Sequence, residues 1–307
     1  MPSVSAYRAG SLLARSLPAS VGSVASRLAG VGAAASTRRR RVVARNLSRV
    51  LGRKLSPIEE RRRVARTFEW YARYYHESFR LPDLSVEEID RGFGYEGVGQ
   101  IEEACARGQG PILALPHLGT WEWAAFWLAL VPGYRVTAIV EPLEPPELFE
   151  WFVGFRESLG MNIVPLGPDA AKASINALKN GEILCLLADR DIPGTGIPVE
   201  FFGETTTLPA GPAALALRTG SPLLPTAVYW RDGSRFGHVR PALDTERRGR
   251  LRDDIARVTQ DLAREFEILI SEAPEQWHLL QPNWPSDYVA LGLPVPDHLA
   301  PFLVGDD

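Results

Sequence analysis

Between residues 111 and 240, short apolar runs alternate with longer segments in which apolar residues recur every three to four positions. The short runs are typical of buried strands, and the periodic segments are typical of amphipathic helices. We expect strands at 111–116, 135–140, 162–165, 182–188, 222–230 and 235–240, and helices at 97–108, 120–131, 145–160, 169–180, 209–220 and 249–273. This order predicts an α/β fold with a central, mostly parallel sheet that is flanked by helices on both faces.

The stretch before this alternating region predicts helices. Ser56, Pro57 and Glu59 form a pattern typical of a helix start, and the helix is expected to end at Pro82. The preceding segment "STRRRRVVARNLSRVLGRKL" places arginines on one helical stripe and apolar residues on another.

We interpret the chain as a single domain, residues 1–307. A helical N-terminal region, residues 1–80, is expected to join a catalytic α/β core at 110–245. Within the core, Glu204 and Thr205 are expected to begin a loop.

Charge is distributed unevenly along the chain. Residues 1–80 contain 17 basic and 4 acidic residues, whereas the remainder contains 17 basic and 33 acidic residues. A basic, amphipathic front end on an acidic body favours binding to an anionic membrane surface. Nucleic acid is not expected as a partner, because no nucleic-acid-binding motif accompanies the arginines. The alternative is a pair of packed helices with a solvated arginine face.

Several kinds of site and segment are not expected. Cys105 and Cys185 lie in unrelated contexts, which favours a reducing compartment without disulfides. No apolar run is long enough to span a membrane, and the N-terminus is atypical of a signal peptide. No metal is expected, because the histidines lack metal-ligand spacing: His76, His117, His238, His278 and His298.

Polar residues follow three of the predicted strands. His117 follows "PILALP", Glu141 follows "RVTAIV", and the run Asp189–Asp191 follows "EILCLLA". Ligands of open α/β sheets bind beyond the carboxyl ends of strands. The three clusters therefore indicate one site at that edge of the sheet.

His117 is the candidate general base, because imidazole titrates near neutral pH. Glu122 lies five positions later, and a turn at Gly119 would allow its carboxylate to return toward the histidine. No activated nucleophile is evident, so a substrate hydroxyl is expected to attack directly. The alternative is a core histidine bonded to a carbonyl group, with Glu122 on a solvated helix face.

The segment "HLGTWE" resembles the H-x₄-[DE] motif of membrane-associated glycerolipid acyltransferases, especially the lipid A late acyltransferase superfamily. Other blocks resemble the superfamily in the same order: "ARNLSRVLG", "YHESFRL", "ADRDIPGTGIPVEFFGE", "PAGPAALALRTGSPLLPTAV" and "QWHLLQPNWPSD". The arginine of "ADRD", the final tryptophan phrase and the basic helix look most like the branch that acylates phosphatidylinositol mannosides. The resemblance covers about residues 5–288.

The resemblance implies transfer of a long acyl chain from acyl-CoA, a co-substrate, to the 6-hydroxyl of a mannose in a membrane glycolipid. No bound cofactor is implied. His117 would accept the hydroxyl proton, and either Glu122 or Glu200 of "VEFFG" would orient the histidine. A peripheral location at the cytoplasmic face of the plasma membrane is expected. An acyl-carrier protein as donor and a non-catalytic membrane-binding module are the alternatives.

Glu141 and Arg156 match blocks that line the active-site groove in this family, and Arg190 is the arginine of "ADRD". Glu141 is a candidate substrate-binding residue. Arg156 is a candidate partner for donor phosphates, or else a surface arginine paired with a nearby acid. Arg190 is a candidate substrate-binding residue, with a structural ion pair as its alternative. The glycines of "GTGIP" could present N–H groups to a phosphate or an oxyanion. One of the nearby tryptophans is expected to line an acyl-chain tunnel: Trp121, Trp123 or Trp127.

Overall fold

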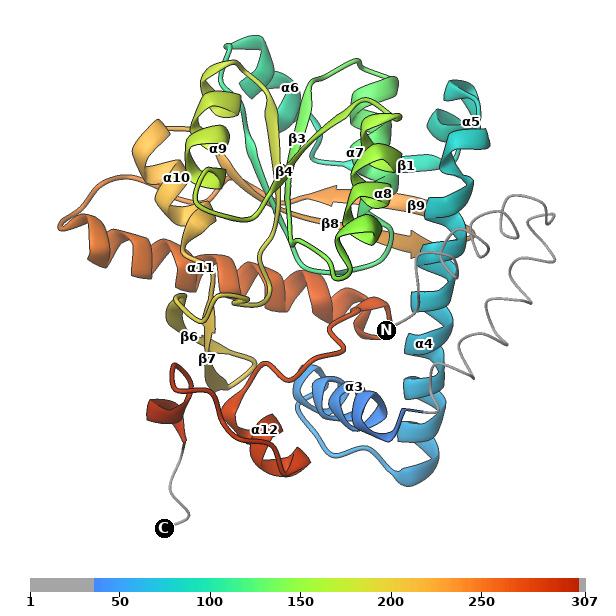
Figure 1. Cartoon of the computed structure of the whole chain (residues 1–307), viewed down its shortest axis with the longest axis vertical. Coiled ribbons are helices and arrows are strands. Elements are labelled where there is room, and N and C mark those ends of the chain that lie inside the picture. The colour runs from blue at the N-terminus through green and yellow to red at the C-terminus, as the bar shows by residue number, and fades with distance from the viewer. Residues whose placement is uncertain (1–35, 304–307) are drawn as a thin grey trace.

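The computed structural model describes residues 36–303 of the chain. Its main sheet has the strand order β1-β9-β8-β2-β5-β3-β4 (Figure 1). The strands are β1 (Phe93–Glu96), β2 (Ile112–Leu115), β3 (Val136–Val140), β4 (Met161–Pro165), β5 (Ile183–Leu187), β8 (Leu223–Arg231) and β9 (Ser234–Val239). Strands β8, β2, β5, β3 and β4 run parallel, whereas β9 is antiparallel to β8. The predicted α/β class and the mostly parallel sheet are confirmed.

The described residues contain ten α-helices. They are α3 (Thr37–Val50), α4 (Pro57–Arg80), α5 (Val86–Arg91), α6 (Gly99–Ala106), α7 (Trp121–Leu130), α8 (Pro146–Glu157), α9 (Ala170–Lys179), α10 (Gly211–Thr219), α11 (Leu251–Glu272) and α12 (Pro285–Leu291). None of the helices within residues 36–303 combines the length and the apolar character needed to cross a bilayer.

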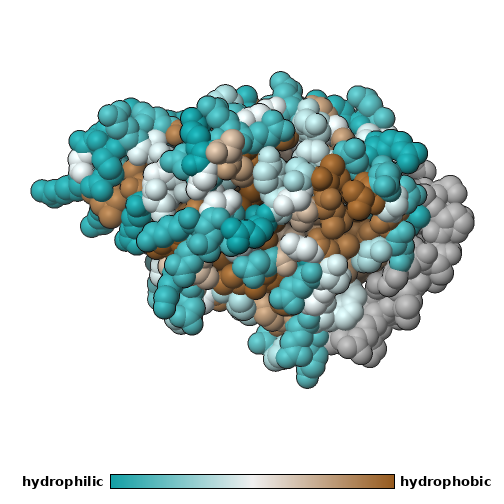
Figure 2. All heavy atoms as spheres, turned by 90° about the horizontal axis from the view of Figure 1, so that it is seen from above, coloured by the Kyte–Doolittle hydropathy of each residue, from teal (hydrophilic) through white to brown (hydrophobic). Residues whose placement is uncertain are grey.

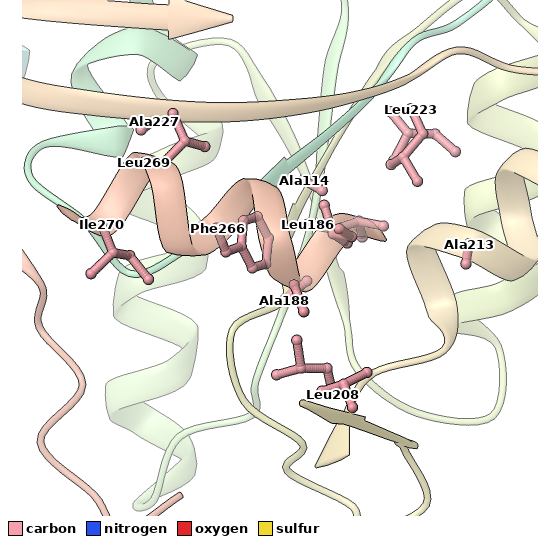
Figure 3. Packing of buried hydrophobic residues seen from close by; sticks show 14 of the residues in the cluster. Ala114, Leu186, Ala188, Leu208, Ala213, Leu223, Ala227, Phe266, Leu269 and Ile270 are labelled. Atoms are coloured by element: carbon pink, nitrogen blue, oxygen red, sulfur yellow. The ribbon is translucent and has the colours of Figure 1, made fainter. Parts of the chain in front are cut away.

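Side chains of the central strands pack alternately on the two faces of the sheet. In β2, Ile112 and Ala114 belong to the core beneath α9, α10 and α11, while Leu113 and Leu115 belong to the core beneath α5 and α7. Figure 3 shows the first of these cores, where Phe266 and Leu269 of α11 approach the strands. Burial of both faces explains why these strands are continuous apolar runs in the sequence.

The helix α4 begins as the sequence predicts. Ser56 caps α4, because its hydroxyl accepts the Glu59 N–H, and Pro57 occupies the first turn. Ser36 caps α3 in the same way. The predicted segment upstream of Ser36 lies outside the described residues.

Ion pairs attach α3 to the far end of the chain. Arg49 contacts both Asp287 and Glu204, and Arg45 contacts Asp287, whose side chain is fully buried. The guanidinium of Arg49 also lies 4.2 Å from the centre of the Trp284 ring. Breaking such a buried pair would leave an uncompensated charge, so these contacts hold α3 against α12.

Short elements account for the differences from the predicted fold. The expected loop at Glu204 and Thr205 is wrong: these residues begin β7 (Glu204–Leu208), which pairs with β6 (Ile197–Phe201) in a separate antiparallel hairpin. The sequence pattern also does not predict β1, β6, α5 or α12. These elements have seven residues or fewer, too few to establish a period. On the face shown in Figure 2, hydrophilic side chains predominate, with smaller hydrophobic areas between them.

Candidate active site

The carboxyl ends of β2 and β5 bring two ionisable residues together. Leu115 and Leu187 are paired in the parallel register. His117 follows the first of them by two residues, and Asp189 follows the second by two residues. The two side chains therefore leave the same edge of the sheet from adjacent strands.

The carboxylate of Asp189 contacts the imidazole of His117. The His117 Nδ1 lies 2.5 Å from Asp189 Oδ1, and the His117 backbone N–H donates to Oδ2 at 3.0 Å. Trp277 Nε1–H donates to the same Oδ2 at 2.8 Å. Burial alone would raise the pKa of Asp189, but the charge of His117 and these hydrogen bonds outweigh burial and hold that pKa below its usual range. The contact leaves Nε2 of His117 available to a substrate.

The expectation that Glu122 or Glu200 orients His117 is wrong. Glu122 is 1% exposed and its Oε1 accepts two hydrogen bonds from Arg156, at 2.9 and 2.6 Å. Glu200 is exposed on β6, where Val199 and Phe201 are buried. Because side chains alternate along a strand, Glu200 points away from the core that its neighbours join.

Arg156, which lines the same cavity as His117, forms a buried ion pair with Glu122. The exposed fractions of the two side chains are 11% and 2%. Burial alone would lower the pKa of Arg156, but the Glu122 charge raises it above its ordinary value. Burial, and then the Glu122 charge, also raise the pKa of Tyr74. The predicted pairing of Arg156 with a nearby acid is present, but it is buried and not on the surface. A contact of Arg156 with donor phosphates stays a prediction.

Glu141 and Arg190 meet across the ends of β3 and β5. Their side chains form an ion pair, and both line the same cavity as His117. The structure therefore joins two of the predicted binding residues to each other. Arg190 Nε is buried and has no hydrogen-bond partner among the described residues.

The glycine-rich loop after β5 is held by its own aspartate. The carboxylate of Asp191 accepts the N–H groups of Gly194 and Gly196 and the hydroxyl of Thr207. The proposed use of these glycine N–H groups for a phosphate or an oxyanion is therefore wrong for this conformation. Their donors are already occupied.

His117 opens into a cavity of about 980 Å³. Its wall contains Trp121 and Arg156 beside the histidine, and it extends between α9 and α10. Apolar side chains form much of that wall, among them Ile139, Leu148, Phe152, Ile175, Leu186 and Leu215. A concave, mostly apolar site with a few converging polar groups is typical of a ligand-binding pocket. Trp123 and Trp127 lie in the core instead.

His278 is a residue of this cavity that the sequence analysis did not single out. Its backbone N–H donates to the His117 carbonyl at 2.7 Å. Its ring lies between Tyr71 and Tyr74, with ring centres 5.3 and 5.7 Å away, and its Nε2 is buried without a partner among the described residues. Burial, and then the charge of His117, lower the pKa of His278 to about 3. The imidazole is therefore neutral near neutral pH.

Acid is expected to destabilise the protein through His278. Its pKa is about 3 in the folded chain, against about 6.5 for an unperturbed histidine. Between these values the unfolded chain binds a proton that the folded chain does not, so stability falls as pH falls. The expected share is about 1.4 kcal/mol per pH unit between pH 5.5 and 4.5. Denaturant unfolding of wild type and His278→Gln at both pH values measures this change in the free energy of unfolding. An equal change in the two proteins would contradict the prediction.

The turn that carries the histidine requires a glycine at position 119. Gly119 has φ +58°, and its N–H donates to the Gln276 carbonyl at 3.0 Å. An added Cβ would lie 1.8 Å from the Val228 carbonyl oxygen. The backbone itself must therefore move if position 119 gains a side chain.

Gly119→Ala is expected to lower the free energy of unfolding by about 2–5 kcal/mol, from left-handed strain plus the clash. Gly133→Ala is the matched control, because Gly133 has φ +73° and no atom within 4 Å of an added Cβ. The control is expected to lose about 1–2 kcal/mol of stability, from the left-handed strain alone. Urea unfolding of both variants provides the comparison, and equal losses would show that the Val228 contact is unimportant.

Asp189 is the site residue that carries a partial signal in the sequence. Its position two residues beyond a predicted strand places it in the same cluster as His117, but its pairing with the histidine follows from the adjacency of β2 and β5, which only the structure gives. His278 carries no such signal, because it follows Trp277 in an irregular segment. Among residues 36–303, no three candidate metal-binding side chains lie close enough to hold an ion.

Comparison with known proteins adds evidence that is independent of this geometry. Residues 3–286 match the profile of the family described as bacterial lipid A biosynthesis acyltransferase. A phosphatidylinositol mannoside acyltransferase of Mycobacterium tuberculosis is 40% identical over 251 residues, which cover 79% of this chain and 76% of the relative. A protein of the same name from Mycolicibacterium smegmatis is 36% identical over 287 residues, covering 92% of this chain and 91% of the relative.

Proposed function

The chain belongs to the bacterial lipid A biosynthesis acyltransferase family, and from that premise we propose that it moves a long acyl chain from acyl-CoA to the 6-hydroxyl of a mannose in a phosphatidylinositol mannoside. The family and the names of the relatives support an acyltransferase. The observation that carries the mechanism is the contact between Asp189 and His117, which lines an apolar cavity.

His117 acts as the general base in this proposal. Its Nε2 takes the proton of the mannose hydroxyl while that oxygen bonds to the thioester carbonyl carbon. The tetrahedral intermediate then collapses, the carbon–sulfur bond breaks, and the proton on Nε2 passes to the departing thiolate. Asp189 fixes Nδ1 as the protonated nitrogen and stabilises the imidazolium that forms between the two steps.

The remaining predicted residues have supporting roles. The apolar wall of the cavity accepts the acyl chain, and exclusion of water there strengthens each polar contact around the reacting carbonyl. Glu141 and Arg190 line the same cavity, and in this proposal they contact the sugar or the donor there. Arg156 lines the same cavity, and Glu122 holds its guanidinium in position.

The protein is proposed to work as a peripheral protein at the cytoplasmic face of the plasma membrane, where both lipid substrates are accessible. The basic residues of the N-terminal region support this location, because anionic lipids attract clustered arginines.

The direct test is to incubate the purified protein with palmitoyl-CoA and a mannosylated phosphatidylinositol. Equal amounts of free CoA and acylated lipid are expected, with the new ester on the mannose 6-oxygen by mass spectrometry. Palmitoyl-acyl-carrier protein replaces the CoA donor in a parallel reaction. Product formed only from the carrier protein would overturn the donor assignment, and no product from either donor would overturn the proposed function.

A further inference from the structure

A second cavity, of about 370 Å³, lies outside the catalytic site between α3, the start of α4 and the end of α12. Four arginines line it: Arg40, Arg41, Arg45 and Arg61. Glu60 is the one acidic residue of its lining, and Ala44, Val64, Ala290 and Leu291 form an apolar wall. We call this space the arginine cavity. Its size is within the range of small-ligand sites.

The arginines of this region are of two kinds. Arg45, Arg49 and Arg53 each have a carboxylate partner within the described structure. The side chains of Arg40, Arg41 and Arg61 are exposed and form no ion pair with any of residues 36–303. Arginines of the first kind attach α3 to α12 and stabilise the start of α4.

The second kind has no such structural role among the described residues. Three like charges around one concave space repel one another, so an anion bound there would relieve an unfavourable interaction. Guanidinium groups match phosphate oxygens in both charge and geometry. The arginine cavity is therefore suited to a phosphate group.

Two exposed apolar side chains lie beside the arginine cavity. Ile58 is 83% exposed and precedes Arg61 by one helical turn, and Val289 is 61% exposed and directly precedes the wall residue Ala290. A free phosphate would give these side chains no contact. A bilayer surface supplies phosphate groups and apolar chains together.

We propose that the arginine cavity binds the phosphate group of an anionic membrane phospholipid while Ile58 and Val289 enter the bilayer interface. The proposal deepens the membrane association within the proposed function, because it assigns a face and a headgroup site. Arg38 and Arg39, which precede Arg40 and Arg41 on α3, line the catalytic cavity. The first turn of α3 therefore separates the arginine cavity from the catalytic cavity.

The first test measures binding to vesicles of phosphatidylcholine with and without phosphatidylinositol. The triple variant Arg40→Ser/Arg41→Ser/Arg61→Ser is expected to bind the anionic vesicles on the order of a hundredfold more weakly than wild type. The control removes three exposed arginines elsewhere, in Arg91→Ser/Arg107→Ser/Arg252→Ser. It is expected to bind within about threefold of wild type. Equal weakening in both triple variants would overturn the proposal, because net charge alone would then explain it.

The second test locates the contact within the full chain. A fluorescent probe on Ile58→Cys, in a Cys105→Ser background, is expected to shift to the blue and to be quenched by brominated lipids. The same probe on Ile268→Cys is the control, since Ile268 is 44% exposed on α11. A probe at position 58 that stays in water while the protein sediments with vesicles would overturn the proposal.

Inorganic phosphate separates a lipid from a soluble ligand. If phosphate binding falls in the arginine variant while vesicle binding does not, the cavity takes a free phosphate and the lipid assignment is wrong. None of these measurements requires turnover. Failure of the lipid site is therefore distinguishable from failure of the acyltransferase proposal.

Discussion

His117→Ala is expected to lower kcat for acyl transfer by about 10²–10⁴-fold, and Asp189→Asn by no more than His117→Ala. The first change removes the proton acceptor. The second keeps the shape of the site, but an amide at position 189 can donate its N–H to Nδ1 and place the ring proton on Nε2. The imidazole would then lack a lone pair facing the substrate hydroxyl.

Steady-state rates of free CoA release measure both effects. KM for the acyl donor is expected to change little, because neither residue is needed to hold the donor in the ground state. The double variant is expected to be no slower than His117→Ala, since Asp189 acts through the histidine. Glu200→Gln is the matched control and is expected to retain wild-type kcat. A large loss in Glu200→Gln together with an active Asp189→Asn would reverse the assignment.

The core strands could be predicted from sequence because each lies between two apolar layers. The run "PILALP" predicts β2, whose four residues are all buried, and "EILCLLA" predicts β5, in which four of five residues are buried. The strand β7 could not be predicted, because its sequence "ETTTL" has one apolar residue. Its burial depends on distant contacts, such as the bond from Thr206 to the Asn283 carbonyl. Such contacts are not encoded in a local pattern.

The position of the candidate site could be predicted from the sequence, but the carboxylate that pairs with His117 could not. Because His117, Glu141 and Arg190 follow the carboxyl ends of strands, they are predicted to share one site. All three line the same cavity in the structure. The partner of the histidine depends on strand order. A carboxylate five residues away looks closer in sequence than one 72 residues away. The adjacency of β2 and β5 makes Asp189 the nearer group, and no local feature of the sequence fixes that adjacency.

Breaking the ion pair between Glu122 and Arg156 is expected to be the largest single loss of stability at the site. Glu122→Met should lower the free energy of unfolding by about 3–5 kcal/mol, because it leaves the Arg156 charge buried without its partner. Arg156→Met is expected to cost about as much, for the same reason applied to Glu122. Urea unfolding of the two variants measures both losses.

The double variant Glu122→Met/Arg156→Met separates structure from function. Replacing a buried ion pair by apolar side chains of similar volume is often neutral, so it should recover most of the lost stability. Acyl transfer is expected to stay low, because an apolar residue at position 156 cannot contact a polar donor in the cavity. The exposed pair Glu103 and Arg107 is the control, and Glu103→Gln should cost less than about 1 kcal/mol. A stable double variant with wild-type turnover would show that the pair serves only the fold, whereas stability without activity would assign Arg156 to the reaction.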